Sequence, residues 1–372
     1  MSVPRLRFPG FGGEWEEKRL EALVSSVTSG RSSHSETGSF PVHGSTGQIG
    51  WSATFEYEGP AILIARVGAN AGKLNHVEGR YGVTDNTLVL PVNDTADQRF
   101  IFDFLTHANL NRFVFGSGQP LITGGMLKRL KGRFPTLTEQ KKIAGFLGVV
   151  DAKIAALRAR VLGLETYKRG LMQALFSQSL RFTKPDGTAF PDWEEKRLGE
   201  VFSERSERGN ATAELLSVTL SRGVVRAAEV DREDGASANR SNYKTVHVGD
   251  IAYNSMRMWQ GANGVSRHFG IVSPAYTVIT PRRGQNPDFW GFCFKLTASI
   301  RVFQRNSQGL TSDTWNLKFP ALSSIRMMVP HPDEQARIAK ALLAMDAKIA
   351  AVQASVDKMQ EFKKGLLQKM FV

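Results

Sequence analysis

One glycine-rich segment has residue types that could bind phosphate. Gly68-Ala-Asn-Ala-Gly72-Lys73 is similar to a nucleotide-binding loop. Only three residues separate its glycines where four are needed, and Leu74 stands where a Ser or Thr would hold magnesium. The spacing therefore argues against nucleotide hydrolysis. It favours a glycine cluster between a strand and a turn, or a basic loop beside a nucleic-acid phosphate.

Two further motifs match catalytic patterns incompletely. Asn286-Pro287-Asp288-Phe289 is close to the Asn-Pro-Pro-Phe loop that holds an extruded base, but its third residue differs and no glycine-rich cofactor loop follows a strand. Pro287 predicts instead the first turn of a helix. Asp186 with Glu194-x-Lys196 matches a metal-dependent nuclease only loosely. The Glu-x-Lys part recurs at Glu16-x-Lys18 without the aspartate, which favours a structural role.

The remaining chemistry-bearing residue types form no recognisable site. None of the seven histidines has the i, i+4 spacing of a helical zinc pair, and there is no Gly-x-Ser-x-Gly motif. The single cysteine, Cys293, excludes internal disulfides and Cys-based zinc sites. We therefore expect no catalytic residue and no metal site in this chain.

The composition points to an anionic partner. The 372 residues include 48 Lys and Arg against 35 Asp and Glu, which gives a net charge of +13. Such a surplus is typical of proteins that bind nucleic acid. The hydrophobic fraction of 41% excludes a disordered chain. No segment approaches the ~20 apolar residues of a membrane span, and the start has no secretory signal, so we expect a cytoplasmic protein without a membrane partner.

The sequence contains one frame twice. Residues 15–20 recur identically at 193–198, and residues 151–156 recur at 346–351. The first pair is 178 positions apart and the second 195, so the stretch between them is 17 residues longer in the second copy. The stretches between the repeated motifs show almost no match. A repeated frame with different contents predicts two modules that are held alike and bind different things.

Each copy ends in a predicted long helix. Residues 139–176 would extend about 57 Å as a helix. Apolar residues follow a 3-4 spacing, which predicts a coiled-coil seam. We expect the two helices to pack antiparallel, and Thr138 and Asp333 to cap them. Lys168 and Lys363 interrupt the seam at matching places, either as snorkelling side chains or to fix the register. The seam residues are Leu147, Val150, Ile154, Leu157, Val161, Leu164, Leu342, Met345, Ile349, Val352, Val356 and Met359.

The variable stretches predict small mixed domains. Short apolar runs at 61–66, 87–90, 250–253 and 275–279 are separated by turn residues and indicate strands. Segments 100–115 and 289–303 have the pattern of amphipathic helices. The predicted fold class is α+β: two globular α+β domains with mostly antiparallel sheets, separated by two long antiparallel coiled-coil helices and related by an internal pseudo-twofold, circular repeat.

Taken together, the repeated motifs resemble the specificity (S) subunit of type I restriction–modification enzymes. The resemblance covers essentially the whole chain. It rests on Phe8-Pro9 with Trp15–Leu20, on Glu139–Ala144, Asp151–Ile154 and Lys168–Phe176, and on their second copies. The second variable stretch also resembles a common target-recognition domain, through Tyr243–Asp250, Tyr253–Trp259 and Gly270–Tyr276.

The resemblance implies a domain order and a set of partners. It places target-recognition domains at 1–136 and 181–332 and helical spacers at 137–180 and 333–372. Each domain would read one half of a bipartite double-stranded DNA target across a fixed unread gap. The helices would dock two methyltransferase (M) subunits, and restriction (R) subunits would join them. No cofactor would bind this chain, because M subunits bind S-adenosylmethionine and R subunits bind ATP and Mg.

Candidate DNA-binding residues follow from the chemistry of base readout, which uses Arg, Lys, Asn and Gln on exposed loops. Each has a simpler alternative as a phosphate contact or a solvated side chain, and for Trp259 as core packing. The candidates are Arg66, Asn70, Lys73 and Gln119 in the first domain, and Lys244, Arg257, Trp259, Gln260, Arg267, Arg305 and Gln308 in the second.

Two other function classes stay open at this point. One is a stand-alone DNA-modifying enzyme, a nuclease or an adenine methyltransferase. The other is a coiled-coil adaptor whose basic charge is incidental. Turnover by the purified chain alone would favour the first, and sequence-selective DNA protection by the chain bound to M subunits would exclude the second.

Overall fold

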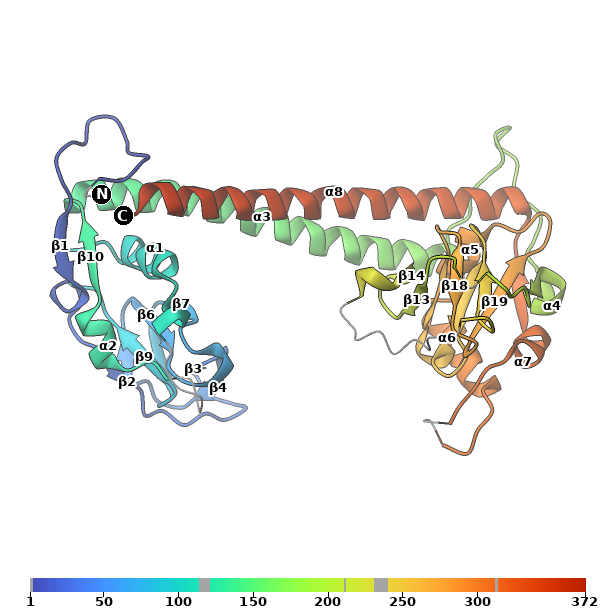
Figure 1. Cartoon of the computed structure of the whole chain (residues 1–372), viewed down its shortest axis with the longest axis horizontal. Coiled ribbons are helices and arrows are strands. Elements are labelled where there is room, and N and C mark those ends of the chain that lie inside the picture. Colours follow the sequence, from blue (N-terminus) through green and yellow to red (C-terminus); the bar gives the residue numbers. More distant parts are fainter. Residues whose placement is uncertain (1–2, 114–120, 211, 231–239, 312–313) are drawn as a thin grey trace. The chain divides into compact units, whose positions relative to one another are not determined.

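The computed structural model describes residues 3–113, 121–210, 212–230, 240–311 and 314–372. The chain forms two compact units, which we call unit 1 (Met1–Arg160 and Val352–Val372) and unit 2 (Val161–Ala351) (Figure 1). Two long helices, α3 (Leu137–Phe176) and α8 (Pro332–Met370), each contribute one part to each unit. The predicted α+β class with two sheet-rich domains and two long helices is confirmed.

The two helices run antiparallel within each unit. In unit 1, Lys363 of α8 pairs with Asp151 of α3, and Met370 shares a core with Ile143. In unit 2, Lys168 pairs with Asp346, and α3 ends at Phe176 beside the start of α8. Every residue of the predicted seam is buried or half-buried, whereas most of the residues between them are exposed.

Both helices begin one residue earlier than the predicted caps Thr138 and Asp333. Helix α3 begins at Leu137, and the amide of Gln140 donates to the carbonyl of Thr136. Helix α8 begins at Pro332, where a proline is favoured because its missing N–H would be unpaired anyway.

Unit 1 holds two four-stranded sheets and one two-stranded ribbon, in the orders β2-β9-β6-β7, β4-β3-β8-β5 and β1-β10. Among the described strands, only β3 and β8 pair in parallel. The elements are β1 (Glu16–Arg19), η1 (Leu20–Ala22), β2 (Thr28–Ser29), β3 (Phe40–Gly44), β4 (Gly47–Ser52), β5 (Tyr57–Glu58), β6 (Ala61–Ala65), η2 (Gly68–Asn70), β7 (Leu74–Val77), β8 (Arg80–Val83), β9 (Thr87–Leu90), α1 (Gln98–Ala108), η3 (Leu110–Phe113), α2 (Gly124–Arg129) and β10 (Lys131–Phe134).

Unit 2 has one four-stranded sheet, β12-β19-β16-β17, and the pairs β13-β14, β15-β18 and β11-β20. The elements are β11 (Glu194–Arg197), α4 (Leu198–Val201), β12 (Phe202–Glu204), β13 (Leu216–Thr219), β14 (Gly223–Arg226), η4 (Ala227–Glu229), β15 (Lys244–Val246), β16 (Ile251–Asn254), η5 (Met258–Gln260), β17 (Asn263–Val265), β18 (Gly270–Val272), β19 (Tyr276–Pro281), α5 (Pro287–Cys293), α6 (Thr297–Asn306), α7 (Phe319–Ser324) and β20 (Arg326–Val329).

The central sheets of the two units have the same register despite their different sequences. Ile62 lies opposite Leu90 in unit 1, and Ile251 lies opposite Ile279 in unit 2. Both partners are shifted by 189 positions (251 − 62 and 279 − 90). The β6–β7 and β16–β17 pairs obey the same shift. The central four-stranded sheet is therefore repeated in the two units, whereas most of the other strand pairings differ.

Helix α5 begins at Pro287, as predicted, and the Asn286 side chain accepts a hydrogen bond from the amide of Phe289. The single helix expected over 289–303 is instead two helices, α5 and α6, with a break after Cys293. The helix expected over 100–115 ends at Ala108 and continues as the short 3₁₀ turn η3.

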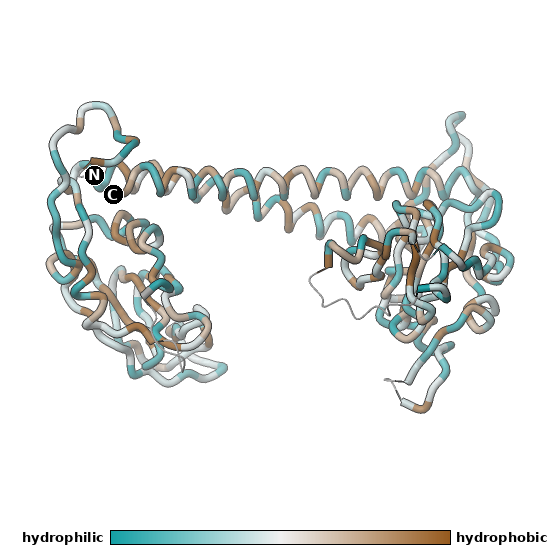
Figure 2. Tube along the Cα trace, viewed as in Figure 1, coloured by the Kyte–Doolittle hydropathy of each residue, from teal (hydrophilic) through white to brown (hydrophobic). Residues whose placement is uncertain are grey.

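The repeated aromatic residues meet in the cores of the two units. In Figure 2, hydrophobic segments of the chain trace lie within both domains. In unit 1, Phe100 lies 6.0 Å from Trp15 and 5.0 Å from Phe371, measured between ring centroids. In unit 2, Phe289 lies 6.0 Å from Trp193 and 5.2 Å from Phe176. Each domain is thus packed onto a helix end by the tryptophan of the opening motif and the phenylalanine of the closing motif.

The repeated Glu-Gln pair fastens each domain to a helix. Glu139 accepts two hydrogen bonds of 2.7 Å from Arg7, and Glu334 accepts bonds of 3.1 and 2.9 Å from Arg181. These carboxylates raise the pKa of both arginines, chiefly through the hydrogen bonds. The side chain of the next residue accepts a hydrogen bond from the amide of a helix-capping residue. Gln140 accepts from Asp97, which caps α1, and Gln335 accepts from Asn286, which caps α5.

Candidate nucleic-acid interface

Two of the predicted binding segments occupy the same place in the fold. We call residues 66–73, between β6 and β7, loop 1, and residues 255–262, between β16 and β17, loop 2. Each loop contains eight residues and one 3₁₀ turn, η2 or η5. The amide of Ala65 donates to the carbonyl of Lys73, and that of Asn254 donates to Ala262, both at 2.9 Å. Sequence alone did not relate these loops.

A glycine with positive φ closes each loop. Gly72 has a φ of +88° and Gly261 one of +85°. A Cβ at Gly72 would lie 2.6 Å from Oδ1 of Asn111, and one at Gly261 would lie 3.2 Å from Ile300 Cδ1. The glycines therefore serve a tight turn against a following helix, which accounts for the sequence that is similar to a phosphate loop.

A second segment braces each loop. The amide of Ile122 donates to the carbonyl of Arg66 at 2.9 Å, and the amide of Leu317 donates to that of Ser255 at 2.8 Å. In unit 2, Trp259 and Trp315 make an edge-to-face pair with ring centroids 5.2 Å apart. The indole N–H of Trp259 donates to the carbonyl of Met256 at 3.0 Å. These contacts hold loop 2 in one conformation.

Several side chains on these loops have no internal partner. Within the described part of the chain, the side chains of Arg66, Asn70, Arg257 and Gln260 make no hydrogen bond or ion pair. Nε of half-buried Arg66 is enclosed without an acceptor. A guanidinium carries five donors, and a buried donor without an acceptor costs about 1–3 kcal/mol.

The other predicted binding residues are placed differently. Lys244 is only 9% exposed and its ammonium lies 3.5 Å from Glu204, so this cation is used inside the domain. Arg267 is exposed but paired with Asp288. Lys73 is exposed, and its Nζ lies 3.5 Å from the carbonyl of Thr46. Arg305 and Gln308 are exposed near the end of α6. Gln119 lies outside the described residues.

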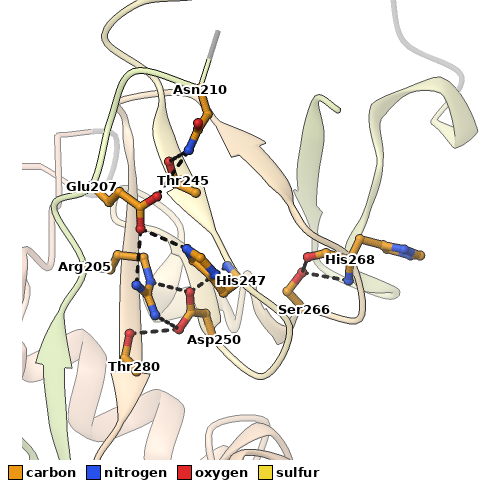
Figure 3. A network of polar contacts seen from close by, with 9 residues as sticks. All are labelled: Arg205, Glu207, Asn210, Thr245, His247, Asp250, Ser266, His268 and Thr280. Carbon is orange, nitrogen blue, oxygen red and sulfur yellow. Dashed lines mark hydrogen bonds and ion pairs between the residues drawn. The ribbon is translucent and has the colours of Figure 1, made fainter. Parts of the chain in front are cut away.

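Sequence reasoning missed a polar network between β12, β15 and the turn before β16 (Figure 3). Asp250 accepts two bonds from Arg205, at 2.6 and 3.1 Å, and one of 2.8 Å from the hydroxyl of Thr280. Glu207 lies 2.9 Å from Nε2 of His247. The Asp250 bond raises the pKa of Arg205, and the His247 bond lowers that of Glu207. The network fastens strands and satisfies its charges internally.

The motifs that matched a nuclease have structural partners. Lys196 pairs with Glu194 at 2.8 Å, and Lys18 pairs with Glu16 at 2.9 Å. Asp186 accepts bonds from the amide and hydroxyl of Thr188. In the part of the chain that the structure describes, no three His, Cys, Asp or Glu side chains gather as metal ligands. None of the described helices is long and apolar enough to cross a membrane.

Comparisons with known proteins point to one family. Residues 13–165 match the model of the type I restriction modification DNA specificity domain. The specificity subunit of the type I restriction enzyme EcoprrI from Escherichia coli is 30% identical over 112 residues, which span 30% of this chain and 28% of that protein. The specificity subunit of MjaVIII from Methanocaldococcus jannaschii is 25% identical over 82% of this chain and 77% of its own length.

Solved structures share the fold over the whole chain. The S subunit of the type I restriction–modification system of M. genitalium aligns with a TM-score of 0.60 at 17% identity, over 100% of this chain and 99% of that one. A structure concerning complex assembly and conformational transition of the type I R-M system aligns with a TM-score of 0.56 at 14% identity, over 99% of both chains.

Proposed function

We propose that this chain is a type I restriction–modification specificity subunit, the DNA-recognition subunit of such an enzyme, because residues 13–165 match the model of that domain and curated specificity subunits are similar to the chain. Specificity subunits are the non-catalytic targeting subunits of these enzymes. In this chain, the residues of the motifs nearest to catalytic patterns form turns and internal ion pairs. The alternative of a stand-alone nuclease or adenine methyltransferase is therefore not favoured.

The observation that carries the proposal is the equivalence of loops 1 and 2. The same sheet, in the same register, presents a loop of the same length in each unit, but the side chains differ. Loop 1 offers Arg66 and Asn70, and loop 2 offers Arg257 and Gln260. Such side chains bind phosphates and read base edges. Each unit would therefore read one half of a bipartite double-stranded DNA target.

The helices would set a fixed gap and bind the catalytic partners. Helix α3 has 40 residues and α8 has 39, which an α-helix carries over about 60 Å. The outward-facing Tyr167 and Phe362, 62% and 52% exposed, stand at equivalent positions of the repeat. An apolar anchor presented twice suits two copies of one partner. We assign this surface to two methyltransferase subunits, with restriction subunits joining them.

The chemistry would then lie outside this chain. In this proposal S-adenosylmethionine binds the methyltransferase subunits, and ATP and Mg bind the restriction subunits. The chain's own residues bind DNA, hold the two readers and dock the partners.

Methylation mapping tests the proposal. The chain is co-expressed with its methyltransferase subunits in a host without adenine methylation, and the methylated adenines are mapped across the genome. We expect one two-part motif with a constant gap, which disappears without this chain. Turnover by the purified chain alone, with target DNA, Mg, S-adenosylmethionine and ATP, would favour the stand-alone enzyme. Methylation unchanged by removal of the chain would refute a targeting role.

A further inference from the structure

A hairpin that the sequence did not single out projects beside loop 2. Strands β13 and β14 pair from Leu216 opposite Arg226 to Thr219 opposite Gly223. The three residues of its tip, Leu220, Ser221 and Arg222, are all exposed, and Leu220 is 54% exposed. The β3–β4 hairpin of unit 1 stands at the corresponding point of the chain order. A two-stranded ribbon of this kind fits the major groove of B-DNA.

Close backbone contact fixes where this hairpin sits. A Cβ added at Gly264 on β17 would lie 2.6 Å from the Cα of Gly223 and 2.8 Å from the amide nitrogen of Val224. The hairpin therefore crosses β17 at a point where only glycine fits. Because loop 2 runs directly into β17, the base of the hairpin and the end of loop 2 are seated on the same strand.

A lysine ties the hairpin tip to loop 2. The ammonium of Lys295, between α5 and α6, donates to the carbonyl of Leu220 at 2.9 Å and to that of Gly261 at 2.5 Å. Lys295 makes no ion pair with the described residues, and burial lowers its pKa to about 8. An ammonium has three donors, so two backbone carbonyls from two different segments can share one cation.

Unit 1 uses another lysine at the corresponding junction. Nζ of Lys73, the last residue of loop 1, lies 3.5 Å from the carbonyl of Thr46 in the β3–β4 turn. Thr106 stands where unit 2 has Lys295, by the same shift of 189 positions (295 − 106) that relates the two sheets. A lysine thus reaches a hairpin-tip carbonyl in both units, from different positions in the chain.

Resting on the proposed function, we propose that the β13–β14 tip and loop 2 form one DNA-reading surface, with Lys295 as the positioning residue that holds them together. Arg222 at the tip then contributes directly to the choice of bases in the half-site of unit 2. A groove lies beside Lys295. It is lined by Arg222 and Arg267 and by Lys168 and Arg169 of α3, against Glu165, Asp288 and Asp346.

The test compares Lys295→Met with Lys295→Arg in the full chain bound to its methyltransferase subunits. The probe is duplex DNA carrying the mapped target, with a matched set of single base-pair changes in each half-site. We expect Lys295→Met to reduce the discrimination between target and mismatch about tenfold in one half-site only. Lys295→Arg, which keeps the charge and the donors, restores most of it. Arg222→Ala lowers discrimination in that same half-site.

The pH profile separates positioning from folding. Discrimination by the wild type in that half-site should fall between pH 7 and 9, as the ammonium of Lys295 loses its proton. It should stay flat in Lys295→Arg. The charged groups that face Lys295 from the neighbouring elements are Arg222, Arg267, Asp288, Lys168, Arg169, Glu165 and Asp346.

Three outcomes would count against the inference. Equal discrimination by Lys295→Met and the wild type would overturn it, as would a loss spread over both half-sites. A uniform loss for all sequences on Arg222→Ala would assign that residue to a phosphate. If the wild-type complex itself shows no sequence selectivity, the proposed function fails instead. Thermal unfolding of each variant shows whether the domain still folds.

Discussion

Trp15 and Trp193 stand at equivalent positions of the repeat, yet only one of them has a hydrogen-bond acceptor. The indole N–H of Trp193 donates to Oε2 of Glu334 at 3.2 Å. The indole nitrogen of Trp15 is buried and has no partner within the described residues. Both rings pack edge-to-face against a phenylalanine of their domain. The two tryptophans therefore share their packing and differ in this hydrogen bond, so each serves as the control for the other.

Changing each tryptophan to phenylalanine should separate the contribution of the indole hydrogen bond to stability from the contribution of ring packing. Both substitutions remove a similar ring area. Trp193→Phe also loses a hydrogen bond to a charged acceptor, which is typically worth about 1.5–3 kcal/mol. Arg181 still pairs with Glu334, so the carboxylate is not left alone. Trp15→Phe loses no such bond and removes an unsatisfied donor. We expect Trp193→Phe to cost about 2 kcal/mol more than Trp15→Phe.

Native-state hydrogen exchange can read the two units separately. The amides of β11–β20 report on unit 2, and those of β1–β10 report on unit 1. We expect exchange to accelerate about 30-fold more at β11–β20 in Trp193→Phe than at β1–β10 in Trp15→Phe, which is the same 2 kcal/mol. Equal acceleration, or a larger effect of Trp15→Phe, would refute the assignment of this hydrogen bond.

Substitutions at Gly72, substitutions at the exposed aromatic residues of the helices and longer helices test the loops and the helices separately. Gly72→Ala should lower the free energy of unfolding by about 1–3 kcal/mol, because the φ of Gly72 is +88° and the new Cβ would clash with Asn111. Gly68→Ala should lower it less, because the φ of Gly68 is +72° but the space around it is open. Thermal unfolding measures both changes. Tyr167→Ala and Phe362→Ala should each weaken binding of one methyltransferase subunit, and the double variant should bind neither, as measured by native mass spectrometry; unchanged stoichiometry at micromolar concentration would remove these side chains from the interface. Lengthening α3 and α8 together by one heptad should lengthen the unread gap of the target, as measured by selection from a library of spacers, and an unchanged gap would exclude the helices as a ruler.

The sequence predicted the frame because the frame repeats. Identical motifs mark both opening tryptophans, and the 3-4 spacing marks both helices. The equivalence of loops 1 and 2 was not visible, because the sheets share only their inward apolar pattern and a register of 189 positions. The hairpin tip was missed for a similar reason. Leu220 and Ser221 carry no compositional signal, and their importance comes from a lysine 75 residues away.

Ion pairs with residues distant in the sequence also decide which basic side chains are available to bind DNA. Lys244 and Arg267 read as exposed basic residues in sequence, but the first pairs with Glu204 and the second with Asp288. Their partners lie 40 positions before and 21 positions after them (244 − 204 and 288 − 267), on other elements. Arg66 and Arg257 differ only in lacking such a partner among the described residues. Sequence gives the charge, and the fold decides whether it is already neutralised.

In the proposed function, each unit reads its own half of the target. The most direct measurement is a binding selection from randomised duplexes with two variants of the full complex. One carries Arg66→Ala with Asn70→Ala in loop 1, and the other carries Arg257→Ala with Gln260→Ala in loop 2. We predict that each variant relaxes the sequence of one half-site only, a different half in each case, with the gap unchanged. Relaxation of the same half-site by both variants, or a uniform loss of affinity in both, would exclude separate reading of the two half-sites by the two units.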